Sequence, residues 1–170
     1  ENGPHETLNR VAISGDGKYI IASSNGDYNR AHLFDRFSSN PLWTYDADED
    51  INSVAISGDG EYIVLGLEAS SSKEIHFFNR NSSMPLWSYE TGAVVYSTSI
   101  SANGDYIVVG TGDDDKKVYL FSKNSSTPIW NYQRESVVYS VSISADGKYI
   151  VGAGPGCDDC DGNVLFFNKN

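Results

Sequence analysis

The chain repeats one pattern every 43 or 44 residues, and this period constrains its fold more than any single residue does. A period of roughly 40–50 residues, carried by short apolar-alternating runs, is typical of a β-propeller or a related stacked array. We therefore expect one domain over residues 1–170, with repeats at about 8–46, 51–89, 94–132 and 137–170. The anchors that recur at equivalent places are Ile13, Ile56, Ile100 and Ile143, Tyr19, Tyr62, Tyr106 and Tyr149, Phe34, Phe78, Phe121 and Phe167, and Trp43, Trp87 and Trp130.

Composition narrows the classes of fold and partner. The 170 residues include 11 Tyr, 7 Phe and 3 Trp, an aromatic content that favours strands. The 12 Lys and Arg against 23 Asp and Glu give a net charge of −11, which repels phosphate backbones, so we expect no nucleic-acid partner. No apolar run approaches the roughly 18 residues that cross a bilayer, so we expect no direct membrane insertion.

The third repeat contains the pattern of one propeller blade. Segments 95–101, 106–110, 118–121 and 128–132 alternate or run apolar as strands do, and polar turns separate them. The first turn contains Asn103-Gly104, which supplies the positive φ that a hairpin turn needs. Four antiparallel strands make one blade, so the sequence predicts an all-β propeller of four-stranded blades.

The strand motifs resemble those of two propeller families. Segment 118–132 (VYLFSKNSSTPIWNY), with counterparts at 75–89 and 32–45, resembles the PQQ-like propeller repeat, in which a Trp docks between neighbouring blades. The preceding half, V-x-I-S-x-D/N-G-x-Y-I-V, is similar to the WD-repeat-like propellers of prokaryotic surface proteins. The resemblance implies the fold but carries no catalytic residues over. The adjacent Cys pair and the calcium-holding acid set of quinone-dependent dehydrogenases have no match, nor do the Trp-Asp and Gly-His pairs of standard WD repeats.

The number of strands is uneven. The first three strand patterns occur four times, but the Trp strand occurs three times. The chain is therefore a fragment of a longer propeller, a half-ring that pairs with a second copy to close eight blades, or a closed four-bladed ring. Because an open array exposes apolar sheet faces, we expect a protein partner or a second copy to complete the ring, as a homodimer or within a longer propeller.

Two cysteines, Cys157 and Cys160, lie in the longest connection between a second and a third strand. Structural zinc usually takes four ligands, and no other Cys or nearby His accompanies this pair. A local disulfide is the first expectation; two free thiols and a metal shared with a partner are the alternatives.

An acidic run at residues 46–50 has the spacing that opens a calcium loop. Its carboxylates are Asp46, Asp48 and Asp50, but Ile51 stands where that loop needs Gly and Ser57 where it needs Glu. We expect solvated acidic loops and no bound cofactor, with calcium as the alternative.

The connections from second to third strand and from fourth to first strand vary between repeats, and in a propeller they lie at the same end. Recognition usually resides in variable loops on a rigid scaffold, so we expect this end to meet the partner. The leading hypothesis is a non-enzymatic scaffold or binding module; a PQQ-like or metal-dependent enzyme domain and a carbohydrate-binding propeller are the alternatives. The candidate binding residues are Asp48, Asp50, Asp113, Asp114, Asp158 and Asp159.

The remaining polar motifs concern catalysis and location. His32 and His76 occupy a third-strand position that other repeats fill with Tyr119 and Leu165, which favours packing over ligation, and we assign no catalytic residue. Asn-Ser-Ser segments beginning at Asn81 and Asn124 fit the acceptor pattern for N-glycosylation. With a disulfide, this pattern would indicate an extracellular or cell-surface protein; a cytoplasmic location is the alternative.

Overall fold

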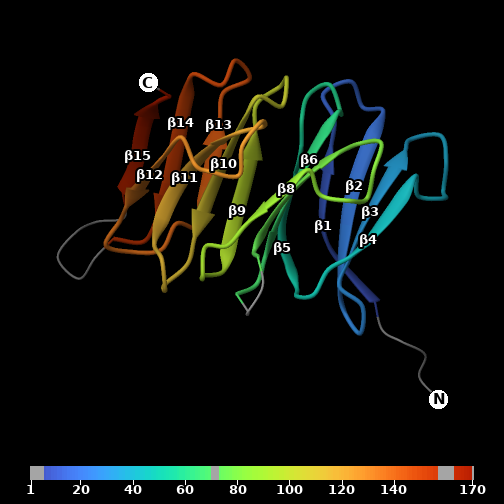
Figure 1. The fold of residues 1–170 in the computed structure, drawn as a ribbon, viewed down its shortest axis with the longest axis horizontal. Helices are drawn as coiled ribbons and strands as arrows, with labels where there is room; N and C mark the ends of the chain where they lie inside the picture. Colours follow the sequence, from blue (N-terminus) through green and yellow to red (C-terminus); the bar gives the residue numbers. More distant parts are fainter. Residues whose placement is uncertain (1–5, 70–72, 157–162, 170) are drawn as a thin grey trace.

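The computed structural model describes residues 6–69, 73–156 and 163–169, which form antiparallel sheets joined by turns and loops. Four sheets follow one another along the chain and stand side by side like the blades of a fan (Figure 1). We number them blades 1 to 4 in chain order. The all-β, propeller-type architecture that the repeat predicts is confirmed.

Each blade is a simple meander in which every strand pairs with the next. Blade 4 shows three strands, and none of the described residues supplies a fourth. The strands are β1 (Glu6–Ile13), β2 (Tyr19–Gly26), β3 (Arg30–Asp35) and β4 (Trp43–Asp46) in blade 1; β5 (Ile51–Ile56), β6 (Tyr62–Leu67), β7 (Ile75–Asn79) and β8 (Trp87–Tyr89) in blade 2; β9 (Val95–Ile100), β10 (Tyr106–Thr111), β11 (Lys117–Ser122) and β12 (Trp130–Gln133) in blade 3; and β13 (Ser140–Ile143), β14 (Tyr149–Gly154) and β15 (Asn163–Asn168) in blade 4.

A hydrogen-bonded turn joins the first two strands of every blade. In blade 2 the Ser57 hydroxyl donates to the Asp59 carboxylate and accepts from the Tyr62 amide, while Gly60 takes the positive φ of 67°. These turns also contact one another: the Gly15 amide donates to the Gly58 carbonyl at 2.9 Å, and Ala102 donates to Ala145 at 3.0 Å. The turns therefore form a continuous row across the four blades.

The apolar core lies between blades rather than within one. We call the side of a blade that faces the next blade along the chain its front face, and the opposite side its rear face. Along β7, Phe77 on the front face packs toward blade 3, whereas Phe78 on the rear face packs toward blade 1. The second strands of the two inner blades, β6 and β10, are almost unbroken apolar runs because both of their faces are covered.

A repeated contact fastens each front face to the following blade. The indole Nε1 of Trp87 in blade 2 donates to the carbonyl oxygen of Lys123 in blade 3 at 2.9 Å, and the Lys123 ammonium lies 5.2 Å from the centre of the Tyr62 ring. We call this set of Trp, Tyr and basic residue the inter-blade clamp. It recurs with Trp43, Tyr19 and Arg80 between blades 1 and 2, and with Trp130, Tyr106 and Lys169 between blades 3 and 4.

The array is open at both ends. Blades 1 and 4 lie at opposite ends of the molecule (Figure 1), and each turns an uncovered apolar face outward: Val11 is 71% exposed and Phe166 is 67% exposed. The alternative of a closed four-bladed ring is thus wrong for this structure. The first strand also begins at Glu6, two residues before the expected start of the repeat, and carries a bulge between Leu8 and Arg10.

Candidate functional site: the loop end of the blades

The two ends of the blades differ in sequence and in charge. One end, which we call the turn end, carries the connections from first to second strand and from third to fourth strand. The other, the loop end, carries the connections from second to third strand and from each blade to the next. Because successive strands run antiparallel, the connections of each class meet at the same end, as the sequence predicts.

The acidic excess of the chain is concentrated at the loop end. Among the described residues the turn end has as many basic as acidic side chains, and Lys18, Lys123 and Lys148 are ion-paired there with neighbouring Asp residues. The loop end has twice as many acidic as basic side chains. Its acidic residues are Asp27, Asp46, Asp48, Glu49, Asp50, Glu68, Glu74, Glu90, Asp113, Asp114, Asp115 and Glu135, and its basic residues are Arg10, Arg30, Lys73, Lys116, Lys117 and Arg134.

Hydrogen bonds hold the two kinds of loop together in blade 1. The Arg30 guanidinium, at the start of β3, pairs with the Asp46 carboxylate, at the end of β4, at 2.7 Å. The Ala47 amide donates to the Asn29 carbonyl at 2.7 Å, and the Ile51 amide donates to the Asn25 side chain at 3.0 Å. The acidic loop at 46–50 is therefore braced against the β2–β3 connection.

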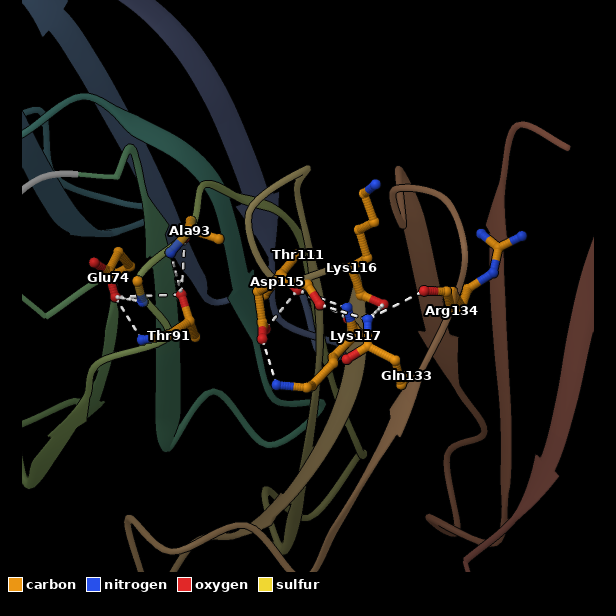
Figure 2. Close-up of polar contacts among 10 residues, drawn as sticks. Glu74, Thr91, Ala93, Thr111, Asp115, Lys116, Lys117, Gln133 and Arg134 are labelled. Carbon is orange, nitrogen blue, oxygen red and sulfur yellow. Dashed lines mark hydrogen bonds and ion pairs between the residues drawn. The ribbon is translucent and has the colours of Figure 1, made fainter. Parts of the chain in front are cut away.

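In blade 2, a buried carboxylate ties the β6–β7 connection to the loop that leads to the next blade. Figure 2 shows Glu74, which is 1% exposed, reaching the turn that follows β8. Its Oε2 accepts hydrogen bonds from the amides of Thr91, at 2.6 Å, and Gly92, at 3.3 Å, while its Oε1 is buried with no hydrogen-bond partner in the described part of the chain. The Thr91 hydroxyl in turn donates to the Ala93 carbonyl, so the turn is fixed from both sides.

Blade 3 has a third brace of different chemistry (Figure 2). The Asp115 carboxylate accepts from the Thr111 hydroxyl at 2.9 Å and is ion-paired with Lys117. The Gln133 side chain, at the end of β12, donates to the backbone carbonyls of Asp115 and Arg134 at 2.9 and 3.1 Å. Three unrelated sets of side chains thus tie the two kinds of loop together in three blades.

The predicted acidic residues of this end occupy different environments. Asp46 is paired with Arg30, whereas Asp48, Asp50, Asp113 and Asp114 are exposed. In the part of the chain that the structure describes, no three His, Cys, Asp or Glu side chains gather as metal ligands, so the carboxylates at 46–50 do not converge on one point. The predictions for Cys157, Asp158, Asp159 and Cys160 lie outside the described residues.

Two tyrosines at this end were not found from the sequence. Tyr96 and Tyr139 are 37% and 56% exposed, and their rings meet edge-on with centres 5.2 Å apart. Partial desolvation, and then the neighbouring Tyr139, Asp113 and Glu68, raise the pKa of the Tyr96 phenol. The signal that would have found them is the recurrence of Val-Val-Tyr-Ser at 94–97 and 137–140.

The third-strand histidines lie in aromatic surroundings. His76 meets the Tyr45 ring of blade 1 at 5.5 Å, and its Nδ1 lies 2.8 Å from the Ser88 hydroxyl. Burial lowers the pKa of His76, which keeps the imidazole neutral. In blade 1, the Nδ1 of His32 lies 2.9 Å from the Thr44 hydroxyl. Both histidines contact neighbouring side chains in the manner of packing residues.

Comparison with known proteins agrees with the blade architecture. Residues 84–122 and 126–168 match the model of the WD domain, G-beta repeat. Each matched segment begins before an outer strand, β8 or β12, and ends at the third strand of the next blade, so the sequence repeat and the blade are offset by one strand. No curated protein matches the chain.

Solved structures show the same fold. A chain of the mitotic checkpoint complex superimposes with a TM-score of 0.74 at 22% identity, covering 95% of this chain and 50% of that one. A chain of Kuenenia stuttgartiensis hydrazine synthase gives a TM-score of 0.76 at 16% identity, covering 93% and 45%. This chain therefore spans about half the length of these neighbours, and at such identities the likeness shows the fold alone.

Within the residues that the structure describes, there is no helix that could span a membrane. The blades, the inter-blade core and the two matched segments all lead to the same class of protein. The chain folds as a β-propeller-type array of four blades, and two of its segments match the WD-repeat model.

Proposed function

We propose that the chain is a non-enzymatic protein-interaction scaffold that uses its loop end to hold a basic segment of a partner protein. The WD-repeat match and the propeller fold support the general role, since such repeats typically serve as scaffolds. The observation that carries the finer proposal is the concentration of acidic side chains at the loop end. The turn end of the same blades has no such excess.

The arrangement of the loop end suits recognition of a positively charged chain. The loops are held in place by Glu74, Asp115 and the Arg30–Asp46 pair. The exposed carboxylates of these loops are therefore positioned before a partner binds. Preorganised charges lose less conformational entropy on binding. Asp113 and Glu68 lie near the exposed Tyr96–Tyr139 pair, and tyrosine faces attract ammonium and guanidinium groups.

The proposal is tested with two fluorescent peptides of equal length, one alternating Lys and Ser and the other Glu and Ser. Anisotropy should show binding of the basic peptide and none of the acidic one, with an affinity that falls as salt is raised, because exposed charges are screened within about 10 Å at 0.1 M salt. Asp48→Asn and Asp113→Asn should each raise the Kd about two- to fivefold, as expected for one exposed charge pair.

Glu61→Gln is the matched control, because it removes one negative charge at the turn end. It should leave the Kd of the basic peptide unchanged. Equal affinity for both peptides would show that charge does not govern binding. An equal effect of Glu61→Gln would show that general acidity, rather than the loop end, governs it. The homodimer expected from the sequence is a separate proposal that rests on the end faces of the array.

A further inference from the structure

The rear face of blade 1 has the composition of a buried inter-blade surface but is exposed. Val11 is 71% exposed and Ile13 is 61% exposed. Their equivalents in blade 4, Val141 and Ile143, are 7% and 9% exposed because blade 3 covers them. The Phe34 ring, which corresponds to the fully buried Phe78, is likewise only partly covered.

The front face of blade 4 has the complementary surface. Val164 and Phe166 on β15 are 70% and 67% exposed. Their equivalents on the third strands of the other blades are completely buried by the next blade, and these are Ala31 and Leu33, Ile75 and Phe77, and Val118 and Leu120.

Each end face also carries part of an inter-blade clamp. On blade 4 the Tyr149 ring stacks on Phe166 with centres 5.8 Å apart, as Tyr62 stacks on Phe77 at 5.4 Å. On blade 1, Arg36 stands two residues after Phe34, the position that Arg80, Lys123 and Lys169 occupy in the other blades. Its guanidinium lies over the neighbouring Phe37 ring, at 4.4 Å from the centre.

The turns at the two ends of the row also carry the backbone groups for a further hydrogen bond of the same kind. In this row the turn of one blade donates an amide to a carbonyl of the next, as from Gly15 to Gly58 and from Ala102 to Ala145. The amide of Ala145 is the equivalent donor at the end of blade 4. The carbonyl of Gly15 is the equivalent acceptor at the start of blade 1.

We propose that these two faces bind each other head to tail between two copies of the chain. The front face of blade 4 in one copy packs on the rear face of blade 1 in the other, with Arg36 of that copy over Tyr149, and the reverse contact closes a ring of eight blades. One copy cannot make this contact with itself because its two faces lie at opposite ends of the array (Figure 1). A second copy supplies both faces. The new contact repeats the Tyr and basic-residue pair of the three existing contacts, while the described residues of blade 4 contribute no Trp to it.

The pairing predicts a distinctive result for variants of the two faces. Val11→Glu and Phe166→Glu each place a charge in the proposed contact, and by symmetry each spoils both contacts of the ring. Sedimentation at about 10–100 µM, a range that detects a micromolar Kd, should show the parent chain as a dimer and each variant as a monomer. An equimolar mixture of the two variants should recover the dimer mass, because one unmodified face remains on each.

Met84→Glu is the matched control, since Met84 is 76% exposed but lies in a β7–β8 turn away from both faces. It should remain dimeric. If the substitutions by Glu disturb folding, Val11→Ser and Phe166→Ser take their place in the same experiment. Their circular dichroism should match that of the parent chain. A monomeric parent chain, a mixture that stays monomeric, or assemblies larger than two copies would each overturn the proposal.

Discussion

At the scale of single residues, the inter-blade clamp explains why Trp recurs at a fixed interval. The Trp87 ring stacks on Phe77 of its own blade at 4.9 Å and also meets Phe121 of the next blade at 5.4 Å. Its Nε1 still reaches the carbonyl of Lys123. Trp has the largest side chain and also carries an N–H donor, so it can span the seam and make this hydrogen bond at the same time.

Replacing Trp87 by Phe should therefore destabilise the chain by about 1–3 kcal/mol, because the Lys123 carbonyl loses its donor and the seam loses contact area. Urea unfolding followed by circular dichroism measures the change. Leu86→Ala is the control, since the neighbouring Leu86 is 55% exposed and should cost much less. Equal losses in the two variants would show that the clamp contributes nothing specific.

The residues of the clamp were only partly predictable from the sequence. The repeated Trp and Tyr positions stand out, and the resemblance to PQQ-like repeats suggested docking between blades, although that specific type stays a prediction. The hydrogen-bond acceptor could not be found, because it is a backbone carbonyl of the next blade and carries no sequence signal. The basic partner was visible in principle as Arg36, Arg80, Lys123 and Lys169, each two residues after a repeated Phe.

At the scale of single elements, the first turns of blades 1 and 4 are held by an ionised carboxylate. In blade 4 the Ser144 hydroxyl and then the Lys148 amide hydrogen-bond to Asp146 and lower its pKa from the ordinary 3.8 to about 2. In blade 1 the Lys18 amide and then the Ser14 hydroxyl lower the pKa of Asp16 in the same way. Blade 3 makes the equivalent bonds with the uncharged Asn103.

These turns predict a specific loss of stability in acid. Because the pKa of Asp146 is lower in the folded chain than in the unfolded one, its contribution is complete above pH about 4 and is lost as the pH falls toward about 2. Asp146→Asn, which copies the turn of blade 3, should keep the neutral-pH urea midpoint and flatten its decline over this range.

Glu135→Gln is the control for the acid experiment, since it removes a carboxylate at the loop end without touching a turn. Its urea midpoint should decline with pH as steeply as that of the parent chain. An Asp146→Asn variant with the parent's acid dependence would exclude the turn as the source.

The strands themselves were largely predictable, and the loop contacts were not. Alternation and the Asn-Gly or Asp-Gly turns place the strands of blade 3 within one or two residues, because each blade is built from local hairpins. The bulge at Leu8 and the burial of Glu74 depend on how neighbouring segments meet, which no local pattern encodes. The acidic character of the loop end could be predicted, but the braces beneath it could not, since each blade uses different residues.

At the scale of the whole molecule, each blade contacts only its neighbours, so stability should vary along the array as it does in other repeat proteins. Blades 2 and 3 have a neighbour on both faces, whereas blades 1 and 4 have one face uncovered. Hydrogen exchange measured on the dilute chain should therefore be slowest in β6 and β10, and faster in β1 and β13–β15. Uniform exchange across all four blades would show that the array unfolds as one unit instead.

The uneven distribution of charge has a consequence for how the molecule orients itself. With excess negative charge at one end of the blades and a balanced opposite end, the protein carries an electric dipole along the strand direction. Beside any anionic surface, such as a phospholipid headgroup layer or a nucleic acid, this dipole turns the balanced end toward the surface. The acidic end then points into solution, where a positively charged chain meets it first.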